Sequence, residues 1–367
     1  MENYDLDNFE PAAKIVVIGV GGAGNNAVNR MIDEEIQNVD FWVANTDKQA
    51  LSTSKSLHRL ILGQDITGGL GAGGEPEIGE AAAEASVEDI KEIVKDANMV
   101  FVAAGMGGGT GTGAAPVVAR IARDAGALVV AIVTRPFTFE GKKRVVNSIS
   151  GLNKLRENVD AIIVVSNDKL LMTAGNSSIS TAFNESDKVL AQSVKTVVNL
   201  ILLPAVINLD FADVRNTLKD AGVSMIGFGV GSGPNRAKDA ANAAINSPLL
   251  EASISGARRA IVAVTCGPNV SLFDAQDTVN LLINASGHDV DVKFGVAIND
   301  QLNDEILVSV IASDFEEEFD FSKPENYQAP VRQPENPVLT SLKEDEPKKE
   351  QESDLDSNSI LPEFLQN

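Results

Sequence analysis

The chain contains few of the residues that form covalent or metal-based cross-links. Its 367 residues include one cysteine, Cys266, and two histidines, His58 and His288. A single cysteine excludes an internal disulfide, and these three side chains cannot build a zinc site of the cysteine and histidine type. Metal sites made only of carboxylates remain open. We interpret Cys266 as a small core residue.

Clusters of basic residues and long apolar runs are also missing. The formal net charge is -22, whereas a nucleic-acid surface needs clustered lysine and arginine. No apolar run approaches the roughly 20 residues of a membrane helix. The acidic residues 1–10 lack the basic and apolar regions of a signal peptide. We therefore expect a cytoplasmic protein that binds no nucleic acid and inserts into no membrane.

Short apolar segments alternate with amphipathic helical patterns over most of the chain. Hydrophobic residues make up 44% of the sequence, which is enough for a large core and two domains. The alternation predicts an α/β fold, with a parallel sheet covered by helices. We predict strands at residues 14–19, 41–44, 99–104, 128–134 and 161–165. The predicted helices begin at residue 24 or span residues 78–93, 116–123 and 144–155.

A long helical pattern divides this first unit from a second one. Leu190, Val194, Val198 and Ile201 recur at near-helical spacing within residues 183–203, which predicts a buried helix joining two domains. Beyond this helix we expect a second, smaller α/β unit. Its strands are predicted at residues 226–230, 259–265, 290–297 and 305–311.

The composition changes after the second unit. Residues 314–367 contain 15 acidic and 5 basic residues, together with 6 of the 14 prolines. Such a segment cannot bury enough apolar surface to fold alone, so we predict a disordered linker. Apolar residues return at 360–365 (ILPEFL). Two interpretations of this final stretch remain open, because it either frays or docks on another molecule.

The most glycine-rich segment is residues 107–113 (GGGTGTG), between an apolar strand pattern and an apolar helix pattern. Glycines let backbone N–H groups point at an anion, and a following helix adds its positive end. A flexible linker would be polar on both sides, so we interpret the segment as a phosphate-binding loop to which Thr110 and Thr112 add hydroxyl donors. The P-loop pattern ending in Gly-Lys-Ser/Thr is absent, which argues against a P-loop NTPase.

A second glycine pattern follows the first predicted strand. Residues 19–24 (GVGGAG) fit G-x-G-x-x-G, and Asp47 follows the next strand. Alone, this pattern suggests a dinucleotide-binding fold and an NAD-dependent oxidoreductase. A nicotinamide site has no evident use for the loop at 107–113, however. Two phosphate-seeking loops at the carboxyl ends of neighbouring strands fit a triphosphate better.

One acidic segment, residues 208–213 (NLDFAD), follows the long helix. Asp210 is a good helix N-cap, and Asp213 lies at the third helical position, where a carboxylate favours the helix dipole. On the sequence pattern alone we favour this capping role over a catalytic one. Carboxylates beside a triphosphate would also repel it, unless they arrive from another molecule only when needed.

Six separate segments together resemble the tubulin/FtsZ superfamily, and within it the bacterial cell-division GTPases. They are GVGGAGNN at 19–26, NTD at 45–47, GLGAG at 69–73, GGGTGTG at 107–113, TFEGKKR at 138–144 and NLDFADV at 208–214. The resemblance spans roughly residues 14–312, and the ordered set of loops makes it specific.

This resemblance implies a GTP and GDP site in which Mg2+ accompanies the nucleotide and no separate protein metal site exists. Glu140 and Arg144 are implied to meet the ribose and phosphates, and Asn167 and Asp187 the base. A carboxylate suits guanine because it accepts from N1–H and the 2-amino group together. The full set implied to bind the nucleotide is Gly21, Gly22, Ala23, Gly24, Asn25, Asn26, Gly108, Gly109, Thr110, Gly111, Thr112, Gly113, Glu140, Arg144, Asn167 and Asp187.

The resemblance also implies a polymer. Subunits of this family stack head to tail, so Asp210 and Asp213 would complete the active site of the neighbouring subunit and orient the attacking water. Hydrolysis would then require assembly of this chain with itself. A filament former that binds GTP without hydrolysing it is an alternative, as is the NAD-dependent oxidoreductase.

Finally, the resemblance assigns domains and partners. It implies a disordered extension at 1–12, a nucleotide-binding domain at 13–182, a central helix at 183–203, a GTPase-activating domain at 204–313 and a linker at 314–358. The peptide at 359–367 would bind membrane-adaptor and division-regulator proteins at the mid-cell division site. Its contact residues would be Ile360, Leu361, Pro362, Phe364 and Leu365.

Overall fold

A computed structural model describes residues 13–174, 179–202, 205–247, 256–286, 290–316 and 319–322. The predicted extension at 1–12 and nearly all of the predicted linker lie outside these residues. The proposed docking peptide, with Ile360, Leu361, Pro362, Phe364 and Leu365, lies outside them as well.

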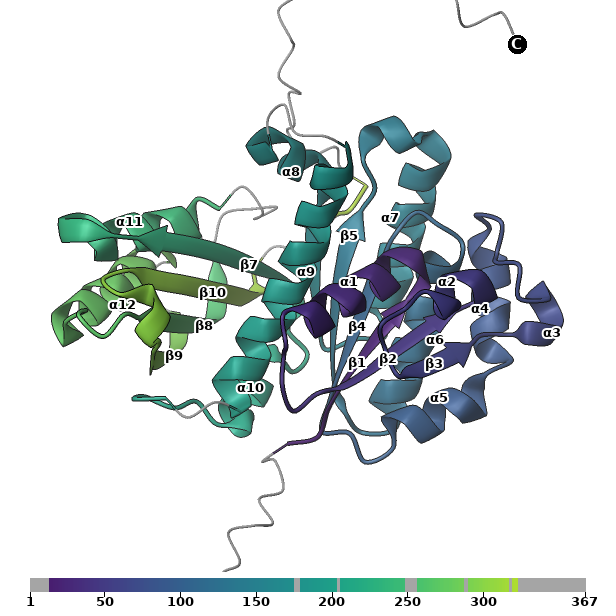
Figure 1. Ribbon diagram of the computed structural model, residues 1–367, viewed down its shortest axis with the longest axis horizontal. Coiled ribbons are helices and arrows are strands. Elements are labelled where there is room, and N and C mark those ends of the chain that lie inside the picture. Colours follow the sequence, from purple (N-terminus) through teal and green to yellow (C-terminus); the bar gives the residue numbers. More distant parts are fainter. Residues whose placement is uncertain are drawn as a thin grey trace, which may run out of the picture. The chain divides into compact units, whose positions relative to one another are not determined.

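A ten-stranded sheet runs through the described residues in the order β3-β2-β1-β4-β5-β6-β7-β10-β8-β9 (Figure 1). Neighbours are parallel from β3 to β7 and again between β8 and β9, whereas β10 runs antiparallel to β7 and β8. The prediction of an α/β fold with two domains is confirmed, and the predicted parallel sheet is parallel except where β10 pairs with β7 and β8. The strands are β1 Ile15–Val20, β2 Asp40–Asn45, β3 His58–Ile61, β4 Met99–Gly105, β5 Leu128–Arg135, β6 Ala161–Ser166, β7 Gly222–Gly231, β8 Ala257–Cys266, β9 Asp291–Ile298 and β10 Ile306–Phe315.

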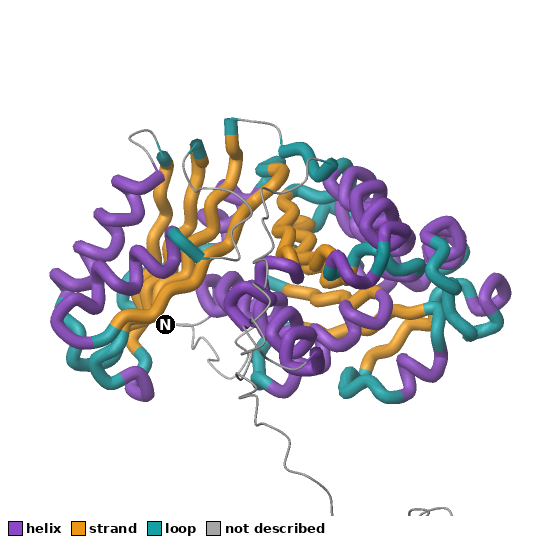
Figure 2. The backbone as a smooth tube through the Cα atoms, turned by 90° about the horizontal axis from the view of Figure 1, so that it is seen from above, coloured by secondary structure: helices purple, strands orange, loops and turns teal. Residues whose placement is uncertain are grey.

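Helices flank the parallel strands on both faces (Figure 2). Short 3-10 turns span Thr138–Glu140, Gly233–Asn235 and Asp300–Leu302. The α-helices are α1 Gly21–Asp33, α2 Lys48–Ser52, α3 Gln64–Thr67, α4 Pro76–Glu84, α5 Val87–Val94, α6 Thr110–Asp124, α7 Lys142–Arg156, α8 Asn167–Ala174, α9 Ile179–Leu202, α10 Phe211–Leu218, α11 Arg236–Ile245 and α12 Leu272–Ser286.

Side chains of successive residues in β1 point to opposite faces of the sheet, so this one strand contributes to two hydrophobic cores. All six residues of β1 are buried. Ile15 and Val17 pack in a cluster with α1, α9 and α10, whereas Val16 and Ile18 pack in a cluster with α4, α5, α6 and α7. Burial of each such side chain contributes about 1.5–3 kcal/mol. This double burial explains why the strand reads as a continuous apolar run.

The predicted long helix is confirmed as α9, with the four apolar side chains that define its pattern all in the core. The sheet then continues through β7, which pairs with β6 over three residues and with β10 over seven. The strands predicted for the second unit correspond to β7–β10, and α11 and α12 pack on them in a third cluster. Cys266 belongs to this cluster, at 4% exposure, so its interpretation as a core residue is confirmed.

Several predicted helices have different boundaries in the structure. The helix predicted from residue 24 begins at Gly21, and the helix predicted at 183–203 spans Ile179–Leu202. The pattern at 78–93 forms two helices, α4 and α5, because the chain breaks at Ser86. The Ser86 hydroxyl is buried and accepts a hydrogen bond from the backbone N–H of Gly63 at 3.0 Å. The helix predicted from residue 116 begins at Thr110 and contains Pro116. Residues 110–113, the second half of the predicted phosphate-binding loop at 107–113, therefore form the first turn of α6.

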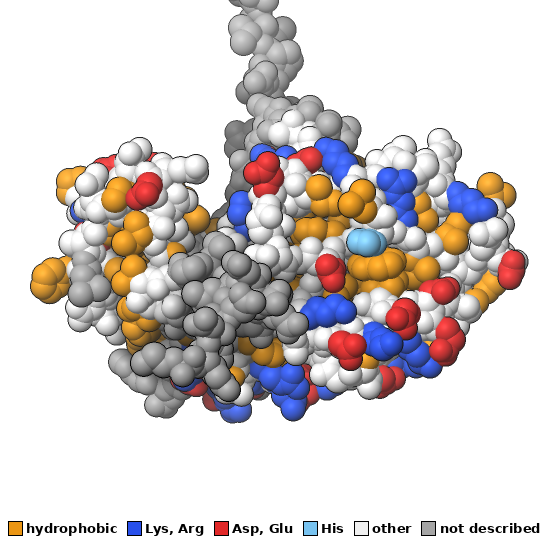
Figure 3. All heavy atoms as spheres, turned by 60° about the horizontal axis from the view of Figure 1, so that its bottom comes forward, with side chains coloured by type: hydrophobic (Ala, Val, Ile, Leu, Met, Phe, Trp, Pro, Cys, Tyr) orange, Lys and Arg blue, Asp and Glu red, His pale blue; other side chains and the backbone are white. Residues whose placement is uncertain are grey.

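The surface is charged, with mixed signs. On the face drawn in Figure 3, acidic and basic side chains are interspersed, as expected of a solvent-facing surface. Within the described ranges, none of the helices combines the length and the apolar character needed to cross a bilayer.

Candidate active site

The two glycine patterns meet at the carboxyl ends of neighbouring strands. Val20 and Ala104 are register partners at the ends of β1 and β4, as the sequence predicted. Gly21 has φ +74, and a Cβ on it would lie 2.8 Å from the backbone nitrogen of Gly111. A Cβ on Gly24 would lie 2.2 Å from the Ala103 carbonyl oxygen. Glycine is therefore required here for the turns to pack on each other.

The same corner presents two helix amino ends. Helices α1 and α6 begin there after Val20 and Gly109, neither of which makes a side-chain cap, and neither first turn contains an acidic residue. Their first N–H groups therefore remain available to an anion, with the helix dipoles adding positive potential. Gly22 and Gly108 face open space, since a Cβ on either would meet nothing within 4 Å. These features fit a phosphate chain.

The two threonines of the loop have partners inside the protein. The Thr112 hydroxyl oxygen accepts a hydrogen bond from the backbone N–H of Gly107 at 2.8 Å and is buried. The hydroxyl oxygens of Thr110 and Thr46 lie 2.7 Å apart. Both threonines thus brace the loop, a structural role that the sequence analysis did not assign to them.

In the glycine turn after β1, one residue is buried and has a structural role, whereas two others are exposed. Asn25 is 3% exposed, and with its amide oriented to satisfy both ends it donates to the carbonyls of Gly19 and Gly21 and accepts from Asn45. It therefore holds the turn closed. Ala23 and Asn26 are exposed, so they can contact a ligand.

Asp47, which the dinucleotide interpretation requires at a ribose, has a local structural role. Its Oδ1 accepts hydrogen bonds from the backbone N–H groups of Gln49 at 2.8 Å and Ala50 at 3.3 Å, and it caps α2. This geometry removes the main support for an NAD site.

The residues implied at the base lie together at the start of α8 and on α9. Asn167 is the first residue of α8, directly after β6, and is 4% exposed; its Oδ1 accepts a hydrogen bond from the Ser186 hydroxyl at 2.8 Å. Asp187 follows on α9. Burial raises the pKa of Asp187 to about 7, although the Arg30 guanidinium of α1 acts to lower it. A desolvated carboxylate of this kind is typical of a ligand site.

Sequence reasoning missed Phe183, which lies one helical turn before Asp187. Its side chain is 40% exposed and meets the Phe137 ring edge to face, with centroids 5.0 Å apart. Phe137 in turn stacks on Phe139 at 4.9 Å. Residues four apart share one helix face. The spacing of Phe183 from Asp187 was therefore the feature of the sequence that could have indicated this neighbour.

Glu140 and Arg144 interact with each other at the start of α7. Glu140 pairs with Arg144, and its Oε1 accepts a hydrogen bond from the backbone N–H of Phe137 at 2.9 Å. A Cβ on Gly107 would lie 2.8 Å from the Arg144 carbonyl oxygen, so the start of α7 packs directly against the glycine loop. The structure therefore brings this pair to the corner where the two glycine turns meet.

Asp210 and Asp213 form the amino-terminal cap of α10, as the local pattern predicted. Asp210 is exposed and Asp213 partly exposed. The end of this helix is tied to the amino edge of the parallel strands, because Gly222 N–H donates to the Asp160 carbonyl and Asp220 pairs with Arg123 at 2.7 Å.

Arg123 is near the far end of α6, whose first turn belongs to the second glycine turn. In Figure 1, α10 lies at the bottom, whereas α8, which follows the carboxyl end of β6, lies at the top. The acidic cap and the glycine turns are therefore at opposite ends of the sheet. Within the described residues, no hydrogen bond or ion pair joins them.

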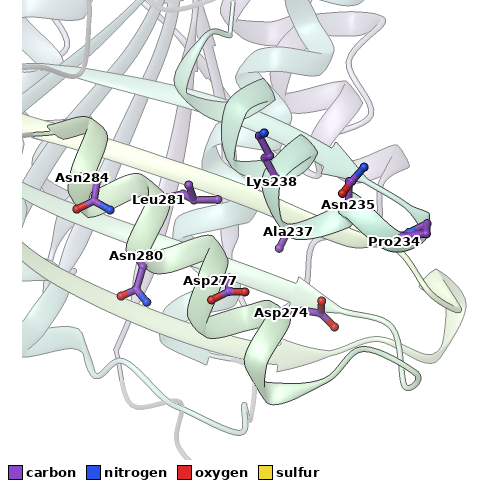
Figure 4. Close-up of a pocket in the computed structure, with 9 residues that line it drawn as sticks. All are labelled: Pro234, Asn235, Ala237, Lys238, Asp274, Asp277, Asn280, Leu281 and Asn284. Carbon is purple, nitrogen blue, oxygen red and sulfur yellow. The ribbon is translucent and has the colours of Figure 1, made fainter.

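Two further cavities lie away from the glycine turns. One of about 520 Å³ lies between α9, the segment before α10 and strands β8–β10, and includes Thr196, Ile207, Val264 and Gly295. The other, of about 360 Å³, lies between α11 and α12 (Figure 4). Its polar lining includes Lys238, Asp277 and Asn280. Neither contains a residue that the sequence analysis assigned to the nucleotide.

Known families and structures match most of the chain. The description "Tubulin/FtsZ family, GTPase domain" matches residues 14–175, and "FtsZ family, C-terminal domain" matches residues 222–316. An empty FtsZ dimer from M. jannaschii is similar at 39% identity and TM-score 0.80, over 86% of this chain and 93% of that chain.

Two other structures agree with this result. An FtsZ point mutant from M. jannaschii is 40% identical with TM-score 0.81, over 85% of this chain and 95% of that chain. CetZ2 from Haloferax volcanii, in a GTPgS-bound protofilament, shares the fold at 24% identity and TM-score 0.71, over 84% of this chain and 95% of that chain. The two matched ranges include both glycine turns and the strands β7–β10, which follow α10. The chain therefore belongs to the tubulin/FtsZ family and is a GTPase.

Proposed function

We propose that this chain polymerises head to tail in a GTP-dependent manner, and that each bound GTP is hydrolysed with the acidic loop, residues 208–213, of the next subunit. The separation of the glycine turns from Asp210 and Asp213 carries this proposal. A chain whose phosphate cradle and exposed carboxylates lie at opposite ends can join them only between molecules. A head-to-tail contact of this kind does not close on itself, so it produces a filament.

The base end of the site supports guanine as the bound base. The Asp187 carboxylate accepts from N1–H and the 2-amino group of guanine, a donor pair that adenine lacks. Asn167 lies beside it, held by Ser186 at 2.8 Å. The exposed Phe183 ring, on the same face of α9, offers an apolar surface for the base. Asn25 shapes the turn, and Asn26 is free to reach the base.

At the phosphate end of the site, the nucleotide is bound mainly by backbone N–H groups. Free N–H groups in the first turns of the two helices, within Gly108–Thr112 and Gly21–Ala23, hold the phosphate oxygens, whereas the Gly113 N–H already donates to the Gly109 carbonyl. Among the described residues, no three His, Cys, Asp or Glu side chains come close enough together to hold a metal ion. Mg2+ would enter with the nucleotide, because this ion prefers phosphate oxygens and water as ligands. It would offset the charge that develops on the transferred phosphoryl group.

The carboxylates of the next subunit supply the remaining chemistry. Asp210 and Asp213 orient a water molecule in line with the γ-phosphate and accept its proton as the new oxygen–phosphorus bond forms, while the bond from the γ-phosphorus to the β–γ bridging oxygen breaks and GDP leaves. Both side chains are accessible at the amino end of α10. Since the cleaved bond lies at the contact between subunits, loss of the γ-phosphate weakens that contact and couples turnover to disassembly.

Membership of the family supports a proposal for the cellular role. We propose that the filaments form in the cytoplasm at the mid-cell division site of a bacterium. Membrane-adaptor and division-regulator proteins would bind the terminal peptide through its apolar residues, with the acidic segment before it acting as a tether.

Dependence of GTP turnover on protein concentration tests the shared site. We expect near-zero phosphate release below a threshold concentration and rising release above it, in step with sedimentable polymer. Constant turnover per molecule at all dilutions would contradict the shared site. Polymer that forms with GTP but releases no phosphate would instead support the alternative of an inert filament former.

A further inference from the structure

The carboxyl end of α10 is held by side chains of β8 and β10. A helix leaves its last four carbonyls without partners inside the helix. In α10, two of these accept from nearby backbone amides. The Asn216 carbonyl accepts a hydrogen bond from Arg259 Nη1 at 2.6 Å, and the Thr217 carbonyl accepts one from the Ser313 hydroxyl at 3.1 Å. Every carbonyl at this end is therefore satisfied.

Arg259 is itself fixed in place. Its Nε donates to Asp314 Oδ2 at 3.1 Å, and its Nη1 also lies 3.2 Å from the Lys219 carbonyl. Arg259 on β8 and Ser313 on β10 are register partners in the sheet. Ser313 is fully buried, and only 23% of the Arg259 side chain is exposed. The planar guanidinium can reach both the carbonyls and the carboxylate, which a lysine cannot do with equal geometry.

The segment that leads into α10 is anchored on β9, the strand next to β8 in the sheet. Ile207, just before the acidic loop, exchanges backbone hydrogen bonds with Val296 of β9 at 3.1 and 3.0 Å. Inside the helix, the Thr217 hydroxyl donates to the Asp213 carbonyl at 3.0 Å. An eight-residue helix has little stability of its own. Its direction, and hence the position of the two carboxylates at its start, depends on these anchors.

We propose that Arg259 is a positioning residue for GTP hydrolysis, acting through α10 on Asp210 and Asp213. The described hydrogen bonds of its side chain go to the carbonyls of Asn216 and Lys219 and to the Asp314 carboxylate. Arg259 sets the angle at which α10 presents the carboxylates to the next subunit's GTP, and a displacement of about 1 Å at such a site lowers turnover by up to about 100-fold. This inference rests on the proposed shared active site.

The test compares Arg259→Gln with Arg258→Gln. Arg258 is the adjacent arginine of β8, is 59% exposed and pairs only with Glu316 at 3.4 Å among the interactions described, so its loss removes the same charge without touching α10. Turnover is measured per sedimented subunit at saturating GTP, together with KM and with polymer mass in a non-hydrolysable GTP analogue. We expect Arg259→Gln to lower kcat about tenfold at unchanged KM and polymer mass.

Two more variants make the result decisive. Arg259→Lys should recover part of the lost turnover, because it restores a donor to the carbonyls. Asp314→Asn should weaken the hold on Arg259 and lower kcat by a smaller factor, which keeps the proposal testable if Arg259→Gln folds poorly. A fall in turnover that merely follows the fall in polymer mass would show a structural role and overturn the proposal.

Comparison with Asp213→Ala separates this inference from the proposed function. In the Asp213→Ala background, Arg259→Gln should cause no further loss of turnover, because both changes act on the same step. If Asp213→Ala abolishes hydrolysis and Arg259→Gln leaves it intact, the positioning role is wrong and the shared site stands. If Asp213→Ala retains full turnover, the shared site itself is wrong.

Discussion

The backbone N–H of Asp213 donates a hydrogen bond to Asp210 Oδ1 at 2.8 Å, and the backbone N–H of Asp210 lies 3.4 Å from Asp213 Oδ2. The two carboxylates proposed to act in catalysis thus also cap the helix that carries them. Capping and catalysis are compatible, because a carboxylate oxygen not used by a backbone N–H can accept a proton from water.

Asp213→Ala should suppress GTP hydrolysis by about 100-fold or more, since it removes a proposed proton acceptor of the shared site. GTP affinity should stay unchanged, because Asp213 lies far from the glycine turns of its own subunit. The Asp210 cap remains, so the free energy of unfolding should fall by less than about 1 kcal/mol. Phosphate release, nucleotide binding and denaturant unfolding measure the three quantities.

The matched control for this change is Asp239→Ala, which removes an exposed carboxylate from the first turn of α11. It should leave hydrolysis unaltered. Loss of GTP binding in Asp213→Ala would mean that the residue belongs to the nucleotide site of its own chain.

Asp187 should make both stability and GTP affinity depend on pH. Burial raises its pKa from 3.8 to about 7, against the opposing effect of Arg30. The folded protein therefore retains a proton that the unfolded chain releases, so this contribution to stability is complete below about pH 4 and is lost as pH rises to about 7. The loss amounts to about 2–4 kcal/mol. Unfolding of the natural protein and of Asp187→Asn across this range should differ by that amount.

GTP affinity should change in the opposite direction with pH. Guanine donors require the ionised carboxylate, so affinity should increase between pH 6 and pH 8, and the increase should vanish in Asp187→Asn. Glu185→Gln on the same helix serves as the control. An unchanged pH profile in Asp187→Asn would place the base away from this side chain.

Thr112→Val should destabilise the phosphate loop. The substitution leaves the Gly107 N–H, now bonded to the Thr112 hydroxyl at 2.8 Å, buried without a partner. Such a loss costs about 1–3 kcal/mol. GTP affinity should fall with it, because the loop loses its preferred shape, whereas Thr112→Ser keeps the hydroxyl and should behave like the natural protein. Equal unfolding midpoints for both variants would contradict this role.

Gly21→Ala and Gly22→Ala should separate fold stability from phosphate binding. At Gly21, φ is +74 and a Cβ would meet the Gly111 nitrogen at 2.8 Å, so the change should destabilise the fold by about 1–3 kcal/mol. At Gly22 the space is open, and alanine in the helix should preserve or slightly raise stability. Its methyl group should nevertheless weaken GTP binding. Calorimetric binding and thermal unfolding of both variants distinguish these effects.

Features encoded in short segments were predictable from the sequence. The strands β1, β4, β5 and β6 are buried on both faces, so each is a continuous apolar run. The core face of α9 shows as helical spacing. The short edge strand β3 (HRLI) was missed, because four half-exposed residues carry no clear pattern. The break between α4 and α5 was missed because it depends on the distant Gly63.

The candidate site divides in the same way. The meeting of the two glycine turns was predictable, because a close approach of two backbones requires glycine at positions such as Gly21 and Gly24, and glycine is visible in the sequence. The role of Phe183 was not, because an aromatic residue in an amphipathic helix usually belongs to the core. The resemblance alone pointed to Asp187, whose desolvation depends on the packing of α9 against α1.

The sequence by itself determined the fold class, the two glycine turns and the capped acidic helix, because steric demands, apolar periodicity and capping act between residues that are close along the chain. Only the tertiary structure decided that the glycine turns and Asp213 lie at opposite ends of the sheet. It also decided that Arg259, more than 40 positions after Asn216, closes the end of the acidic helix. Distance, burial and pairing of this kind arise from packing between segments that are remote in sequence, and no local pattern encodes them.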